Sequence, residues 1–138
     1  MITFISAFYI LKSKFSKEKY EKWFSNLLPN VKNFNLVIFC DQKSKPLLEK
    51  YTKNNDKIKL VLLRIEKFYN YKYKSGWIKN HKKNKLAEYE DWQLNMLWSE
   101  KIAFVKNAYK NKYFPETEWY GWCDIGYFRG EELGDISQ

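Results

Sequence analysis

Apolar residues along the chain fall into two alternating patterns. Four largely apolar runs, each of a length suited to a buried strand, lie at residues 2–9, 34–40, 58–65 and 118–124. Between these runs, apolar residues recur at the spacing of one helical face. This spacing predicts three helices: one between Ser16, as its cap, and Pro29, one over 44–54 and one over about 92–110.

Strands that are largely apolar and alternate with helices are typical of a parallel sheet covered on both faces. Right-handed crossovers put the second and third strands on one side of the first. The fourth strand follows a long excursion, residues 66–90, and is expected on the other side, which gives the strand order 3-2-1-4. The excursion is rich in Tyr, Lys and Asn, and it is either a functional loop or contains short helices.

The predicted strand order indicates where a ligand would bind. Ligands of open α/β sheets bind beyond the carboxyl ends of the strands, at the point where the strand order reverses. That point lies between the first and fourth strands here. Phe8 and Tyr9 after the first strand, Asp41 after the second and Asp124 after the fourth would therefore line one crevice.

Asp124 is the leading candidate in this crevice, because it follows an aromatic run at the end of the fourth strand. Its carboxylate could hold Mg²⁺ or Mn²⁺ with a diphosphate as co-ligand, or it could close the strand as an ordinary polar turn residue. Gly126, two residues on, permits close backbone approach but adds no metal ligand. A metal would therefore need further ligands from the substrate or from a second carboxylate.

Three other charged residues are candidates, each with a structural alternative. Lys101 falls in the centre of the apolar face of the last predicted helix, so its ammonium must reach solvent, pair with a buried acid or bind a ligand. Asp41 either contacts a ribose hydroxyl or a base, or caps the segment that follows it. Arg129 either binds phosphate or pairs with Glu131 or Glu132.

Composition narrows the classes of function. The 138 residues suffice for one domain, and no apolar run is long enough to span a membrane. The absence of a basic leader before the first strand predicts a cytoplasmic location. The net charge of +9 divides into +14 for residues 1–112 and −5 for 113–138, which suits a phosphate-bearing ligand with a divalent cation.

Several familiar sites are missing from the sequence. There is no dinucleotide-binding glycine fingerprint and no P-loop. The single histidine, His81, lies in a polar run and is expected to be solvated, so no Ser-His-Asp triad is available. Cys40 and Cys123 lack metal-site spacing and are expected to be small buried hydrophobes in strands.

Four segments occur in the order and at the spacing of a known family. They are residues 3–9 (Thr-Phe-Ile-Ser-Ala-Phe-Tyr), 39–41 (Phe-Cys-Asp), 97–105 (Leu-Trp-Ser-Glu-Lys-Ile-Ala-Phe-Val) and 122–129 (Trp-Cys-Asp-Ile-Gly-Tyr-Phe-Arg). Together they make essentially the whole chain resemble the HtrL/YibB (WlaTC/HtrL) family of glycosyltransferase-like proteins. Each segment alone is a weak signal, whereas four in order are fairly specific.

The resemblance implies a GT-A-like fold that binds a nucleotide-diphospho-sugar and transfers the sugar to a glycan or lipid-linked glycan, with Mn²⁺ or Mg²⁺ as cofactor. In such folds the carboxylate after the fourth strand supports the metal and diphosphate, and here Asp124 matches that position. The resemblance also implies that Phe8, Tyr9 and Asp41 face the nucleoside and that Lys101 approaches the phosphates.

Members of this family are longer than the present chain. The resemblance therefore predicts that residues 1–138 form a single nucleotide-sugar-binding domain without the acceptor half. An inverting transfer needs a general base near the acceptor hydroxyl, and residues 130–138 contain no candidate for it. The catalytic residues thus stay unassigned, and the chain is expected to be a hexosyltransferase-type enzyme or a fragment of one that is inactive alone.

Two other functions fit the same sequence. The net charge and the Tyr/Lys-rich stretch 66–90 suggest a basic nucleic-acid-binding module whose aromatic rings stack on bases. A degenerate domain kept for protein contacts would bind neither a nucleotide sugar nor a nucleic acid. A nucleic-acid-binding module has no need of carboxylates that converge at strand ends, so a nucleic acid is the less expected partner.

Overall fold

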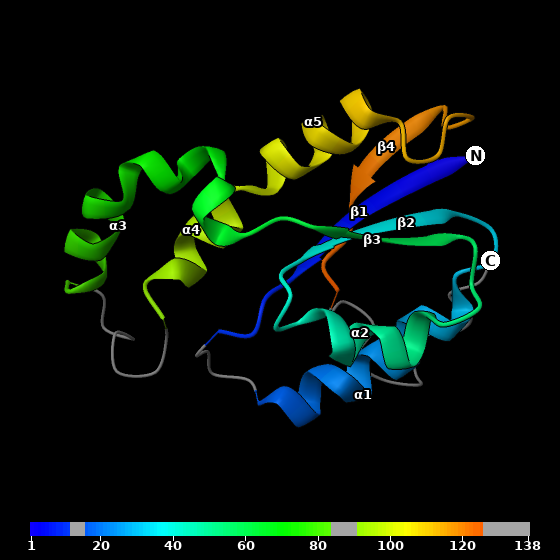
Figure 1. The fold of residues 1–138 in the computed structure, drawn as a ribbon, viewed down its shortest axis with the longest axis horizontal. Helices are drawn as coiled ribbons and strands as arrows, with labels where there is room; N and C mark the ends of the chain where they lie inside the picture. Colours follow the sequence, from blue (N-terminus) through cyan, green and yellow to red (C-terminus); the bar gives the residue numbers. More distant parts are fainter. Residues whose placement is uncertain (12–15, 84–90, 126–138) are drawn as a thin grey trace.

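A computed structural model of the chain describes residues 1–11, 16–83 and 91–125. Its centre is a four-stranded sheet in which each neighbouring pair is parallel (Figure 1). The strands are β1 (Ile2–Phe8), β2 (Asn35–Cys40), β3 (Ile58–Leu62) and β4 (Trp119–Trp122). Their order is β3-β2-β1-β4, so the predicted α/β class and strand order are confirmed.

Strand β2 forms the centre of the hydrophobic core. All six of its residues are buried, as expected for a strand with a helical layer on each side. It pairs with β1 from Asn35 opposite Thr3 to Cys40 opposite Phe8. Strand β1 pairs on its other side with β4, so β1 and β4 lie side by side at the predicted point of reversal.

Helices α1 (Lys17–Leu27) and α2 (Lys45–Thr52) cover one face of the sheet, together with the short 3₁₀ helix η1 (Leu28–Asn30) (Figure 1). Ser16 caps α1 as predicted, because its Oγ accepts a hydrogen bond of 3.3 Å from the Lys19 amide. We call the core on this side the aliphatic face. Its fully buried members include Phe24, Leu27, Leu36, Ile38 and Leu48.

The opposite face is covered by the segment between β3 and β4. This segment contains the 3₁₀ helices η2 (Ile65–Lys67) and η3 (Tyr69–Tyr73) and the helices α3 (Lys74–His81), α4 (Gln93–Ser99) and α5 (Lys101–Asn111). Helix α5 lies against β1 and β4, whereas α3 packs on η3 and α4 beyond the strand ends (Figure 1). We call the core on this side the aromatic face. Its buried members include Tyr9, Phe39, Phe68, Met96 and Phe104.

Two sequence expectations about this segment have different outcomes. The predicted short helices are present in the described part of the excursion, up to residue 83, whereas residues 84–90 lie outside the described residues. The helix predicted over about 92–110 is present, but it is interrupted at Glu100, which separates α4 from α5. Among the described residues, no helix has the length and apolar character needed to cross a membrane.

Candidate functional site

Three side chains meet at the carboxyl end of β4, next to the point where the strand order reverses. The Lys101 ammonium lies 3.3 Å from the Asp124 carboxylate oxygen Oδ1. The Trp122 indole N–H donates a 2.8 Å hydrogen bond to that same oxygen. The Lys101 ammonium also lies 5.5 Å from the centre of the Trp122 ring, within the range of a cation–π contact.

A stack of aromatic rings positions this cluster. The Trp122 ring lies nearly parallel to that of Phe104, with ring centres 5.9 Å apart. Phe104 in turn stacks on Phe39 of the central strand, with ring centres 4.9 Å apart. Trp122 is therefore attached to the buried core on one side and to the Asp124 carboxylate on the other.

The ion pair within the cluster is open to water. The Lys101 side chain is 38% exposed and the Asp124 side chain is 61% exposed. Ion pairs in such surroundings contribute about 0–1 kcal/mol to stability, because water solvates both charges well. Exchanging this pair for contacts with a ligand would therefore cost little free energy.

Asp41 lies at the end of β2 and caps the segment that follows it. Its Oδ1 accepts a 2.9 Å hydrogen bond from the Ser44 amide, and its carbonyl oxygen accepts one of 3.0 Å from the Lys45 amide. Capping of the following segment is the role that the geometry shows. Contact between Asp41 and a ribose or a base stays a prediction.

Phe8 and Tyr9 are both buried, with 5% and 4% of their surface exposed, and they point into opposite faces of the sheet. Phe8 packs edge-on against Phe24, and the Tyr9 hydroxyl donates a 2.6 Å hydrogen bond to the Leu63 carbonyl. The expectation that the loop at Phe8 and Tyr9 faces a nucleoside stays a prediction, and the burial of both side chains limits how it could do so. Only the main chain of Phe8 and Tyr9 could contact a ligand in this geometry.

Hydrogen bonds join the segments that follow β1, β2 and β3 into one floor. The Ile10 amide donates a 2.9 Å bond to the buried hydroxyl of Ser44, and the Leu63 amide donates one of 2.9 Å to the Cys40 carbonyl. Burial, with a further contribution from the nearby Cys40, Asp41 and Glu100, raises the pKa of the Tyr9 phenol above its ordinary value. Tyr9 is therefore a neutral hydrogen-bond donor at physiological pH.

Sequence reasoning missed a buried carboxylate, that of Glu100. Only 2% of this residue is exposed, yet its carboxylate accepts hydrogen bonds from the amides of Tyr69 (2.6 Å) and Asn70 (3.1 Å) and from the Asn70 side-chain Nδ2 (2.7 Å). It thereby satisfies amides at the first turn of η3. The signal in the sequence was an acidic residue beside Lys101, in the middle of a predicted continuous helix.

The described residues fit a divalent cation only in part. They contain no group of three or more His, Cys, Asp or Glu side chains placed to hold a metal ion. Asp124 offers one carboxylate at an exposed strand end, which suits Mg²⁺ or Mn²⁺ that takes its other ligands from phosphate oxygens and water. Arg129, the other expected phosphate ligand, lies outside the described residues.

Two expectations about single residues need correction. His81 is half-buried and its Nδ1 is shielded from solvent. Cys123 is only half-buried and follows the end of β4, whereas Cys40 is fully buried. Burial raises the pKa of the Cys40 thiol to about 12 and that of Cys123 to about 11.

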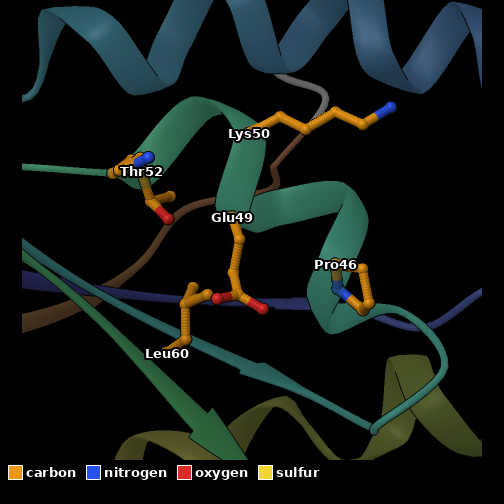
Figure 2. A pocket seen from close by; sticks show the side chains of 6 residues that line it. Pro46, Glu49, Lys50, Thr52 and Leu60 are labelled. Carbon is orange, nitrogen blue, oxygen red and sulfur yellow. The ribbon is translucent and has the colours of Figure 1, made fainter.

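A separate hollow of about 550 Å³ lies between α2 and the edge strand β3 (Figure 2). In Figure 2, Glu49 extends from α2 toward Leu60 of β3, while Lys50 points away toward α1, where it pairs with Glu21 at 3.4 Å. The lining residues are Pro46, Glu49, Lys50, Thr52, Lys53 and Leu60. This hollow shares no residue with the cluster at Asp124.

Comparisons with models of protein families, with curated proteins and with solved structures gave no match to this chain. The geometry at the strand ends is thus the basis for a functional proposal, with the sequence resemblance as a second support.

Proposed function

We propose that this α/β domain binds a nucleotide-diphospho-sugar at the carboxyl ends of β1 and β4, as the donor-binding part of a GT-A-like glycosyltransferase. One observation carries the proposal: an ammonium and a carboxylate, those of Lys101 and Asp124, lie 3.3 Å apart at the point of strand reversal. Open α/β sheets bind their ligands at this point.

The two charges suit the two parts of a metal-bound diphosphate. Lys101, at the start of α5, would bind phosphate oxygens, as a flexible point charge can. Asp124 would hold Mn²⁺ or Mg²⁺ by one carboxylate oxygen. The bound metal ion would supply positive charge to the diphosphate, which is the leaving group of sugar transfer.

Trp122 and the hydrogen-bonded floor complete the role of this chain. The indole N–H fixes the direction of the Asp124 carboxylate, and the aromatic stack fixes the indole. Main-chain atoms after β1, held by Ser44 and by the Tyr9 hydroxyl bond, would contact the nucleoside. Asp41 would contact it only if its capping bond to Ser44 were shared or exchanged.

Sugar transfer itself is proposed on the resemblance to the HtrL/YibB family. The acceptor is a glycan or a lipid-linked glycan, and the location is cytoplasmic. No described residue is assigned as the general base, so the proposal for residues 1–138 is donor binding, with transfer as the function of the enzyme to which the domain belongs.

Isothermal titration and thermal shift with UDP, GDP, CDP and their sugar conjugates, each with and without Mn²⁺, test donor binding. We expect one nucleotide to stabilise the chain, by about 2.7 kcal/mol at 100 times its dissociation constant. Asp124→Asn should abolish the dependence on Mn²⁺, and Lys101→Met should weaken nucleotide binding about tenfold, equivalent to roughly 1.4 kcal/mol.

Lys106→Met is the matched control, because Lys106 is an exposed lysine on the same helix that makes no contact with Asp124. This variant should bind the nucleotide as the unchanged chain does. A chain that melts cooperatively and responds to none of the nucleotides would refute the proposal. Equal losses in Lys101→Met and Lys106→Met would show that binding depends on overall charge and not on this cluster.

A further inference from the structure

The helix η3 presents an unusual group of side chains to solvent. Tyr69 and Tyr73 are 64% and 53% exposed, although both are large aromatic residues. The Lys72 ammonium lies between them, 4.0 Å from the centre of the Tyr69 ring and 5.3 Å from that of Tyr73. We call Tyr69, Lys72 and Tyr73 the tyrosine–lysine surface.

The backbone beneath this surface is held firmly. The buried Glu100 carboxylate accepts the amide hydrogens of Tyr69 and Asn70, and the Trp77 indole N–H donates a 3.2 Å bond to the Asn70 carbonyl. Phe68, immediately before η3, packs into the aromatic face with only 4% exposure. The two tyrosines are therefore exposed on a fixed support, which lowers the entropy cost of binding a ligand.

The surroundings of the surface are strongly cationic. Residues 67–83 contain six lysines, all of them exposed, and no acidic residue. Such a concentration of one sign of charge attracts anionic ligands. The exposed residues of α3 are polar, so this helix offers no apolar face for insertion into a membrane surface.

The surface is connected to the proposed donor site through two adjacent residues. Glu100 holds η3, while its neighbour Lys101 contacts Asp124 at the end of β4. A ligand bound to the tyrosine–lysine surface would thus lie near the α4–α5 junction. The proposed donor site includes Lys101 from the same junction. This position suits the second substrate of a transfer reaction.

We propose that the tyrosine–lysine surface binds an acidic glycan, which names the acceptor class for the proposed function and rests on that function. Exposed tyrosine rings offer flat apolar surface to pyranose rings, and Lys72 with the neighbouring lysines neutralises carboxylate or phosphate groups on the sugars. A single-stranded nucleic acid is less well matched. The basic residues of 67–83 are all lysines, whereas arginine is the preferred residue for nucleic-acid recognition.

Titration calorimetry with three probes tests this inference: oligogalacturonate as an acidic glycan, maltoheptaose as a neutral one, and oligothymidylate. We expect oligogalacturonate to bind at least about tenfold more tightly than either of the other probes. The double variant Tyr69→Ala/Lys72→Gln should weaken oligogalacturonate binding about tenfold, because it removes one stacking ring and the central charge.

The matched control is Tyr109→Ala/Lys110→Gln, which removes an exposed tyrosine and an exposed lysine from the far end of α5. This control should bind oligogalacturonate as the unchanged chain does. Equal losses in the two double variants would overturn the inference, and so would tighter binding of oligothymidylate than of oligogalacturonate. Absence of oligogalacturonate binding at millimolar concentration would also overturn it.

Nucleotide thermal shifts on the same preparations separate this inference from the proposed function. A chain that responds to a nucleotide but not to oligogalacturonate refutes the acidic-glycan site and leaves the donor site standing. A chain that binds oligogalacturonate through Tyr69 and Lys72 but responds to no nucleotide supports the glycan site and refutes donor binding. Both variants change exposed side chains, so circular dichroism should show an unchanged fold.

Discussion

The two faces of the sheet are built in different ways. The aliphatic face is covered by α1 and α2, two regular helices whose apolar residues follow a helical stripe. The aromatic face is covered by short helices, a broken helix pair and a stack of rings, and it encloses the buried Glu100 carboxylate. The aromatic face also includes the charged and aromatic residues of both proposed sites. These are Lys101, the Trp122 side chain and the tyrosine–lysine surface.

This difference indicates a division of tasks between the faces. The regular helices α1 and α2 bury apolar area through aliphatic side chains and edge-on rings such as Phe8 against Phe24, and their polar partners lie at the helix ends, as at Ser16. Irregular helices leave backbone groups that must be satisfied, and buried polar side chains such as Glu100 satisfy them. The irregular face consequently directs charged and aromatic residues toward the strand ends, whereas the regular face contributes stability.

The largest expected effects come from removing one large ring from each face. Phe24→Ala and Phe104→Ala should each lower the free energy of unfolding by about 3–5 kcal/mol, because both rings are fully buried. Only Phe104→Ala should also weaken nucleotide binding, because Phe104 supports Trp122. Urea unfolding and calorimetry on the folded variants measure the two effects. Equal loss of nucleotide binding in Phe24→Ala would contradict the division between the faces.

The next effect is the response to alkaline pH. Burial raises the pKa of Cys40, on the aliphatic face, from 9.0 to about 12. Above pH 9 the unfolded chain loses this thiol proton while the folded chain keeps it. Stability should therefore fall between pH 9 and 12, by up to about 1.4 kcal/mol per pH unit for this group.

Cys40→Ala should make the loss of stability with rising pH less steep from pH 9 upward. On the aromatic face, Tyr9→Phe should reduce it only above pH 10, the ordinary pKa of a tyrosine. Urea unfolding at a series of pH values measures both slopes. An unchanged slope in Cys40→Ala would mean that this thiol is not buried as described.

A smaller effect is expected at the polar centre of the aromatic face. Glu100→Ala should cost about 2–3 kcal/mol of stability, because it leaves amides at Tyr69 and Asn70 without their charged acceptor. Amide hydrogen exchange at these two positions should become faster, whereas exchange in α1 and α2 should not. Glu100→Gln, which retains one acceptor oxygen, should lose less. Unchanged exchange at Tyr69 and Asn70 would show that η3 is held by other contacts.

The smallest effect on stability is expected at the candidate site itself. Lys101→Met should change the free energy of unfolding by less than about 1 kcal/mol, because its ion pair with Asp124 is exposed. The same variant should impair nucleotide binding. Its melting temperature should therefore change little in a thermal melt, whereas its nucleotide affinity should fall in a titration. A large loss of stability would show that Lys101 supports the fold.

The regular part of the molecule could be predicted from the sequence. Largely apolar runs identified the four strands, and the handedness of crossovers gave their order. The stripe that begins at Tyr20 identified α1 and its cap at Ser16. These features depend on local spacing and general topology, both of which a single sequence contains. The place of Asp124 at a strand end also follows from them.

The irregular face could be predicted only in part. The sequence indicated one helix from a stripe of apolar residues, namely Leu94, Leu97, Trp98, Val105 and Ala108. In the structure this helix is interrupted at Glu100, and Trp98 is 51% exposed. The break depends on hydrogen bonds from Glu100 to residues about thirty positions earlier, which helical periodicity cannot reveal. Lys101 was expected in the centre of an apolar face, whereas it begins a new helix and is free to reach Asp124.

The pairing of β1 with β4 governs the order in which the chain can fold during synthesis. Ile2 of β1 lies opposite Trp119 of β4, so β1 must wait until β4 has been synthesised before this edge of the strand is covered. At 5–20 residues per second, the 60 residues from Leu63 to Trp122 take roughly 3–12 s to synthesise. During that interval, Ile5 and Phe39 on the aromatic face lack their covering helices, so the nascent chain exposes a surface that chaperones recognise before its binding site exists.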